Sequence, residues 1–150
     1  MKQIPAAATS GALAGAIMSM AMMLSMVITG RSMWTLPNLI AAMWMGVEVA
    51  SEAPSAATLA GFLTHMATSV IMGLIAIPFI RDLSPRRTYL AALSYALASY
   101  PIVFAAVLSW ANPLMVERAG LISMTAGHAL FGVVMAATYL RLTPSEPRAP

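Results

Sequence analysis

Four long apolar stretches dominate the pattern of hydrophobic and polar positions along the chain. They cover approximately residues 8 to 29, 56 to 79, 88 to 110 and 119 to 140, and none contains Asp, Glu, Lys or Arg. A helix needs about 20 apolar residues to cross a bilayer core about 30 Å thick. The pattern therefore predicts an all-α membrane protein, a bundle of four transmembrane helices that forms a single domain over residues 1 to 140.

The connection between the first two stretches carries an amphipathic pattern of its own, "TLPNLIAAMWMG". Thr35 as the N-cap, Pro37 in the first turn and Gly46 as the stop predict a short helix over residues 36 to 46. We expect this helix to lie in the outer membrane interface or to tuck back against the bundle. Aromatic side chains at span boundaries are typical interface anchors, and here they are Trp34, Trp44 and Trp110.

Charged residues flank the apolar stretches and predict the topology. One side carries Lys2, Arg81, Arg86, Arg87, Arg141 and Arg148, whereas the other carries only Arg31 and Arg118. The positive-inside rule therefore places both termini and the loop over residues 80 to 87 in the cytoplasm. Residues 141 to 150 are rich in Pro and polar residues, which predicts a disordered cytoplasmic tail.

A short internal repeat relates the second and fourth stretches. A shift of 63 positions pairs His65 with His128, and Met72 with Met135. Two helical hairpins joined in this order run in the same direction, so the pattern predicts two parallel helical-hairpin repeats with both histidines at similar depth in the outer half of the bilayer.

Small residues recur at four-residue spacing and predict where helices approach closely. The predicted packing positions are Gly11, Gly15, Gly61, Ser69, Gly73 and Gly132. Because His65 and His128 share these faces, both imidazoles should point into the bundle, where each needs a polar partner. We expect a freed carbonyl near Pro101 or a nearby hydroxyl in that role, and the candidate hydroxyls are those of Thr64, Thr68, Ser94, Tyr95, Ser99, Ser123 and Thr125. The two histidines fit three interpretations: an interhelical hydrogen bond, axial ligation of a b-type haem, or contact with a quinone or pigment.

Composition limits the chemistry further. The chain contains no cysteine, which excludes disulfides and thiolate metal sites. It contains 14 methionines. Met18, Met22 and Met26 stack three thioethers on one helix face, and soft sulfur suits Cu(I), although Met also fills gaps in apolar packing. The absence of charge within the spans disfavours ion-coupled transport, no catalytic motif is present, and the scattered basic residues form no nucleic-acid surface.

The segments "GRSMWTLPNLIAAMWMG", "AGFLTHMATSVIMGL" and "GHALFGVVM" resemble an uncharacterised bacterial family of small four-span integral membrane proteins. The shared features are the outer Trp-x-x-Pro-Asn-Leu-Ile segment and a histidine in spans two and four. The resemblance implies a multi-pass protein of the bacterial cytoplasmic (inner) membrane and implies no reaction.

These observations predict a non-catalytic accessory or structural subunit of a larger bacterial membrane complex, respiratory or photosynthetic. Its expected partners are the lipid bilayer and other integral membrane subunits, with no nucleic acid and no firmly predicted cofactor. The first alternative is an electron-transfer protein that holds haem b or a quinone at His65 and His128. The second alternative is Cu(I) handling through Met18, Met22 and Met26.

Overall fold

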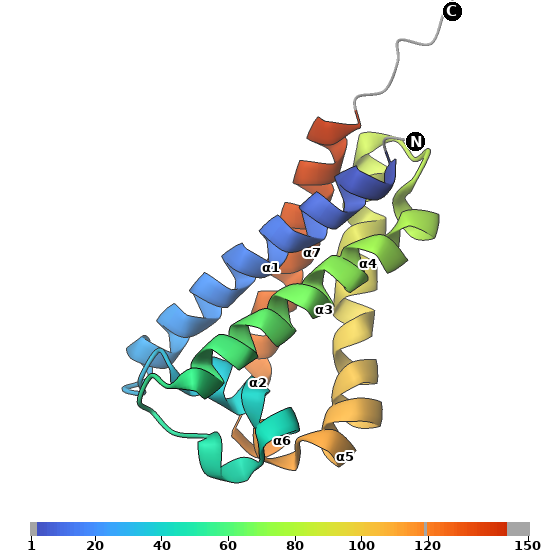
Figure 1. Ribbon diagram of the computed structural model, residues 1–150. Helices are drawn as coiled ribbons and strands as arrows, with labels where there is room; N and C mark the ends of the chain where they lie inside the picture. The colour runs from blue at the N-terminus through green and yellow to red at the C-terminus, as the bar shows by residue number, and fades with distance from the viewer. Residues whose placement is uncertain (1–2, 119, 144–150) are drawn as a thin grey trace, which may run out of the picture.

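The computed structural model describes residues 3–118 and 120–143, with the side chains of residues 107 and 108 left out. This part of the chain is entirely helical or irregular (Figure 1). The elements are α1 (Gln3–Ile28), α2 (Thr35–Met45), η1 (Val47–Val49), α3 (Ala56–Ile80), α4 (Pro85–Val103), η2 (Phe104–Leu108), α5 (Ser109–Ala111), α6 (Pro113–Arg118) and α7 (Leu121–Leu142).

Four helical stretches are long and apolar enough to cross a membrane: α1, α3, α7 and the continuous run Pro85–Ala111 through α4, η2 and α5. The structure thus confirms the four predicted span-length helices, with ends within a few residues of the expected ones. Helix α7 continues to Leu142, so residues 141 and 142 belong to a helix and not to a tail. The remainder of the predicted tail, residues 144–150, lies outside the described residues.

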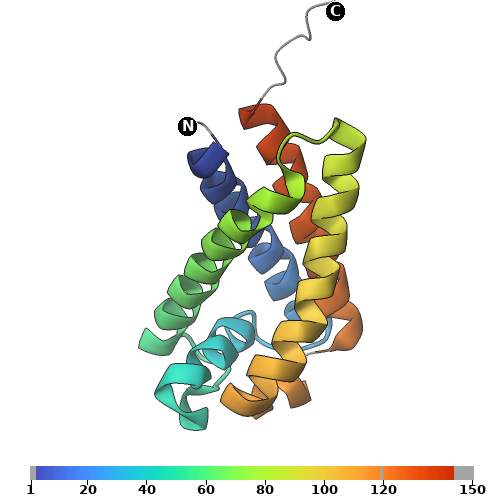
Figure 2. The same cartoon turned by 90° about the vertical axis from the view of Figure 1, so that its right-hand side faces the viewer.

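Helix α1 occupies the centre of the arrangement, since it packs along both α3 and α7, and α7 in turn packs against α4. Helices α3 and α4 are consecutive in sequence, yet they diverge from their short turn toward the end that carries α2 and α6 (Figures 1 and 2). We refer to that end as the outer end, because the charge pattern predicts that it faces away from the cytoplasm. Near the turn the two helices are joined by Tyr95, whose hydroxyl donates to the Met72 carbonyl at 3.0 Å and whose ring stacks on Phe79.

Small residues allow these helices to approach closely. A Cβ atom on Gly73 of α3 would lie 2.5 Å from the Ala7 carbonyl oxygen and 2.9 Å from the Cα of Gly11, both on α1. A Cβ on Gly132 of α7 would lie 2.9 Å from the carbonyl oxygen of Ala92 on α4. The other predicted packing positions also lie at helix contacts: Gly15 faces the Ser69 side chain, and Gly61 faces the Pro37 backbone.

Helix α2 does not lie on the surface but tucks back against α3, where Asn38 and Leu39 are fully buried. The Asn38 side chain holds it there, because its Nδ2 donates to the carbonyls of Ser51 and Ala53, each at 2.8 Å, and its Oδ1 accepts from the Thr58 hydroxyl at 2.7 Å. Gly46 ends the helix with a φ of 91°, a left-handed conformation that favours glycine.

The predicted N-cap of α2 is wrong. The capping position is Trp34, which makes no side-chain capping bond, and Thr35 lies within the helix. Thr35 is 3% exposed and its Oγ1 has no hydrogen-bond partner. Tertiary burial of the first turn of α2 therefore overrides the local capping preference of threonine.

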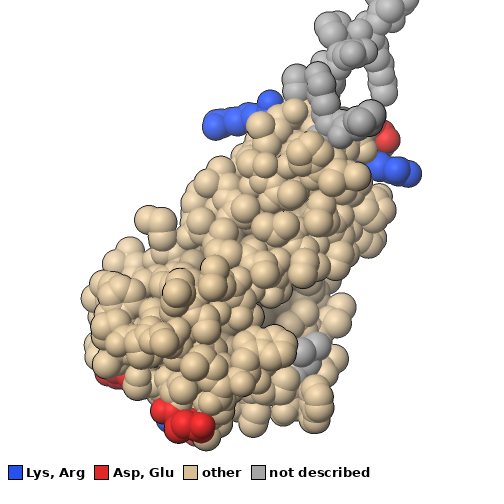
Figure 3. All heavy atoms as spheres, viewed as in Figure 1, with Lys and Arg blue, Asp and Glu red and all other residues tan. Residues whose placement is uncertain are grey.

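Charged side chains gather at the two ends of the face seen in Figure 3, and the surface between them is uncharged. The end with the α3–α4 turn includes Arg81, Arg86 and Arg87; Lys2 and Arg148 lie outside the described residues. At the outer end Trp44 and Trp110 are 70% and 85% exposed, whereas Trp34 is partly buried. An uncharged belt between two charged ends is the surface that a bilayer requires.

Candidate functional site: a histidine and methionine cavity

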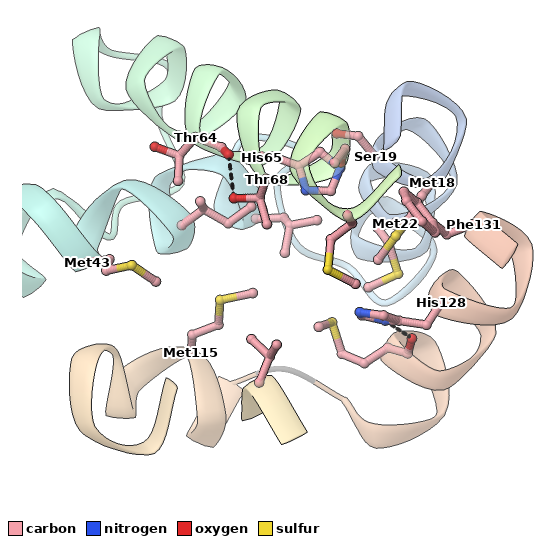
Figure 4. Close-up of a pocket in the computed structure, with 16 residues that line it drawn as sticks. Met18, Ser19, Met22, Met43, Thr64, His65, Thr68, Met115, His128 and Phe131 are labelled. Carbon is pink, nitrogen blue, oxygen red and sulfur yellow. Dashed lines mark hydrogen bonds between the residues drawn. The ribbon is translucent and has the colours of Figure 1, made fainter. Parts of the chain in front are cut away.

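A cavity of about 170 Å³ lies between the helices toward the outer end (Figure 4). Helices α1, α2, α3, α4, α6 and α7 all contribute to its wall. Both histidines of the chain line it, together with hydroxyl side chains and six methionines. The hydroxyl residues are Ser19, Thr64, Thr68 and Ser69, and the methionines are Met18, Met22, Met43, Met72, Met115 and Met124.

His65 reaches the cavity from α3 and is oriented by α1. Its Nε2 lies 3.0 Å from the carbonyl oxygen of Gly15. A carbonyl oxygen can only accept, so Nε2 carries the hydrogen, and in the neutral ring Nδ1 holds the free lone pair. A Cβ atom on Gly15 would lie 3.7 Å from this Nε2, in ordinary contact, but it would clash with the Ser69 side chain, so Gly15 permits the close crossing of α1 and α3 that brings His65 to the carbonyl.

His128 reaches the cavity from α7, and its tautomer is fixed in the same way but with the nitrogens exchanged. Its Nδ1 donates to the Met124 carbonyl, one turn earlier on the same helix, at 2.8 Å. The lone pair therefore resides on Nε2. The ring packs on Tyr100 of α4, with centroids 4.9 Å apart, and Tyr100 packs on Phe104 at 5.3 Å.

Phe104 begins the π-helical segment η2, which follows Pro101 closely. Proline lacks a backbone N–H and so interrupts the α-helical ladder. This break in α4 lies where the helix contributes Val103 to the cavity wall. Irregular helix geometry thus coincides with the site, as π-bulges frequently do.

The expected partners of the two imidazoles are wrong. Neither ring nitrogen that makes a hydrogen bond contacts a hydroxyl or a carbonyl freed by Pro101; the acceptors are the carbonyls of Gly15 and Met124. A helical carbonyl has two lone pairs and keeps one after its ladder bond, which makes it available wherever a small residue exposes it. The sequence feature that could have indicated the acceptor of His65 is Gly15, which lies on a predicted packing face. The corresponding feature for His128 is the four-residue spacing to Met124 on the same helix.

The predicted methionine triad is only partly gathered at the cavity. Met18 and Met22 line it, whereas Met26 is buried elsewhere, with 6% of its surface exposed. Sequence reasoning missed the other four methionines of the wall, because they come from α2, α3, α6 and α7 with no common spacing. One of them, Met72, has a sulfur that accepts from the Tyr95 hydroxyl at 3.3 Å.

The donors of this site are neutral and soft. No Asp or Glu lines the cavity, and the described part of the chain holds no cluster of three or more His, Asp or Glu side chains. The groups that this wall offers to a ligand are the two imidazoles, the thioethers and the hydroxyls.

Haem and quinone fit this cavity less well than a small ion. Pockets for drug-sized ligands usually measure about 300 to 1,000 Å³, whereas this one measures about 170 Å³. An oxidised quinone needs hydrogen-bond donors for its carbonyls, but both imidazole N–H groups already donate to the backbone. The hydroxyls of Ser19 and Thr68 are engaged as well, with the Met23 sulfur and the Thr64 carbonyl. The hydroxyls of Thr64 and Ser69 remain as donors in the wall, so the small volume is the main argument against a quinone.

Comparison with known protein families, with curated proteins and with solved structures finds no match to this chain. The fold itself defines the class: an all-helical protein with four candidate membrane-spanning helices. The resemblance to a small four-span bacterial family stays a prediction.

Proposed function

We propose that this chain is a non-catalytic, multi-pass protein of the bacterial inner membrane that binds Cu(I) in its histidine and methionine cavity. The observation that carries the proposal is that one small cavity is lined by several thioethers and by two imidazoles, each of which keeps one ring nitrogen free of the backbone hydrogen bond that it makes. The proposed ligand set differs from the predicted methionine triad. It keeps Met18 and Met22, excludes Met26 and adds His65 and His128.

The hydrogen bonds of the histidines support a metal site. Histidines that bind metals usually donate their second ring N–H to a carbonyl or a carboxylate, which fixes the tautomer and aims the lone pair. His65 and His128 both do so with backbone carbonyls, at 3.0 Å and 2.8 Å. Thioether and imidazole together are donors that suit Cu(I).

The charge of the ion follows from the charge of the wall. No carboxylate lines the cavity, so the ion's charge stays uncompensated by its ligands. The cost of moving an ion into a low-dielectric interior grows with the square of its charge, so a divalent ion costs about four times as much as a monovalent one of equal size. The cavity therefore favours Cu(I) over Cu²⁺, Zn²⁺ and other divalent ions.

A direct test is anaerobic titration of the purified protein with Cu(I) in competition with a chromogenic chelator. We expect stoichiometric retention by the wild type, and strongly reduced retention by His128→Leu and by Met22→Leu. Met20→Leu is the matched control, because Met20 lies on the same helix as Met22 but is 71% exposed. A wild-type protein that leaves all the Cu(I) with the chelator overturns the proposal.

X-ray absorption identifies the ligands independently. The chain has two histidines and no cysteine, so any imidazole scattering around the metal arises from His65 or His128 and any sulfur scattering arises from methionine. We expect both signals in the loaded wild type. A spectrum with oxygen ligands alone contradicts the assigned site.

Our second proposal is the role of an accessory subunit in a larger respiratory or photosynthetic membrane complex. It is supported by the large apolar side chains that α3 and α4 present outward, among them Leu59, Leu63, Ile71 and Leu90. Such a surface suits neighbouring subunits as well as lipid. Affinity purification in mild detergent should recover one larger complex reproducibly, and recovery of the isolated chain alone counts against this role.

A further inference from the structure

The outer wall of the cavity is built by the two short helices α2 and α6. Helix α2 contributes Leu36, Ile40 and Met43, and α6 contributes Met115. In Figure 4, Met43 and Met115 lie on the side of the cavity away from Met18 and Met22. Each is the sole metal-binding donor that its helix presents to the cavity.

A buried amide fixes these two helices relative to each other. Asn112, which is 2% exposed, donates from Nδ2 to the Leu39 carbonyl at 2.6 Å and accepts the Met115 N–H on Oδ1 at 3.1 Å. Leu39 lies one helical turn before Met43. The Asn112 side chain therefore connects the backbone of α2 near Met43 to the backbone of Met115 on α6. A buried amide is costly unless both of its ends are bonded, and here they are.

We propose that Met43 and Met115 form an outer Cu(I) contact through which the ion reaches the two histidines, with Asn112 as the residue that positions the pair. This inference rests on the proposed Cu(I) function. Thioethers on flexible side chains are adaptable soft ligands, and a pair of them without imidazole holds the ion more loosely than the histidine side of the cavity does.

Transfer is then a ligand exchange. The Cu–S bonds to Met43 and Met115 break as bonds form to the inner donors Met22, His65 and His128. The copper stays Cu(I) throughout, and neither an electron nor a proton is transferred, since the acting nitrogens already carry free lone pairs.

The experiment measures how fast the full-length protein in detergent takes Cu(I) from its bathocuproine disulfonate complex, followed by the decay of the complex's absorbance. The double variant Met43→Leu/Met115→Leu should load several-fold more slowly and reach the same final stoichiometry. The matched control is Met33→Leu/Met45→Leu, because these methionines lie near the same end, are each 41% exposed and do not line the cavity. The control should load at the wild-type rate.

The outcomes distinguish a failure of the outer contact from a failure of the proposed function. Wild-type loading by the Met43→Leu/Met115→Leu variant overturns the outer contact and leaves the inner site intact. Loss of equilibrium binding in that variant also overturns it, since the two thioethers would then belong to the inner site. Failure of the wild type to bind Cu(I) refutes the proposed function itself.

The positioning role of Asn112 has its own variant. Asn112→Asp keeps the acceptor for the Met115 N–H but loses the donor to the Leu39 carbonyl. We expect slower loading at unchanged stoichiometry, and an unchanged loading rate overturns this part of the inference.

Discussion

Nε2 of His65 on α3 lies 3.0 Å from the carbonyl oxygen of Gly15 on α1, 50 residues earlier in the chain. The hydrogen bond joins two helices of span length and holds the proton on Nε2, which leaves the lone pair of Nδ1 available. The interhelical hydrogen bond expected for an interior histidine and a metal-binding role are thus compatible, since they use different nitrogens of one ring.

Stability and metal binding should separate between the two histidines. His65→Leu removes an interhelical hydrogen bond, worth about 0.6 to 2 kcal/mol in a membrane bundle, whereas His128 bonds only within its own helix. We expect His65→Leu to lower the free energy of unfolding, measured by titration with a denaturing detergent, more than His128→Leu does. Both variants should lose Cu(I) retention. Equal destabilisation contradicts the assigned bonding.

The close crossing of α1 and α3 should not tolerate a methyl group. The Cβ introduced by Gly73→Ala would lie 2.5 Å from the Ala7 carbonyl oxygen, and such overpacking costs about 1 to 3 kcal/mol. Gly120→Ala is the control, because its Cβ would meet nothing closer than the Ser123 hydroxyl at 3.7 Å. Thermal unfolding in detergent compares the two, and equal melting temperatures would sink the prediction.

The buried hydroxyl of Thr35 should reduce stability. Its Oγ1 has no hydrogen-bond partner, and an unsatisfied buried polar group costs about 1 to 3 kcal/mol. The isosteric change Thr35→Val should therefore raise the melting temperature. Thr58→Val is the opposite case, because the Thr58 hydroxyl donates to Asn38 and accepts the Ser55 N–H. It should lower the melting temperature, and the same sign for both variants refutes the argument.

The charge distribution predicts that both chain ends face the cytoplasm. A fluorescent-protein fusion at the C-terminus should be fluorescent, and an alkaline phosphatase fusion at the same point should be inactive. The matching phosphatase fusion within residues 50 to 55, between η1 and α3, should be active. The reverse pattern would place the cavity toward the cytoplasm and contradict the proposed outer location.

The sequence determined the four helices of span length, the stop of α2 at Gly46 and the small-residue faces. These features are local: a helix must satisfy its own backbone within the bilayer, and a glycine face is visible in the spacing of one segment. The capping residue of α2 was misassigned because the burial of Thr35 depends on neighbours far along the chain. The predicted repeat and hairpin pairing stay untested.

Only the tertiary structure decided the composition of the site. It brought Met43, Met72, Met115 and Met124 to the wall that Met18 and Met22 already share, and it left Met26 outside. It also selected the Gly15 and Met124 carbonyls as the acceptors that set the tautomers of the histidines. The physical reason is that a cavity among six helices is defined by distances between segments, and no periodicity within a single helix encodes those distances.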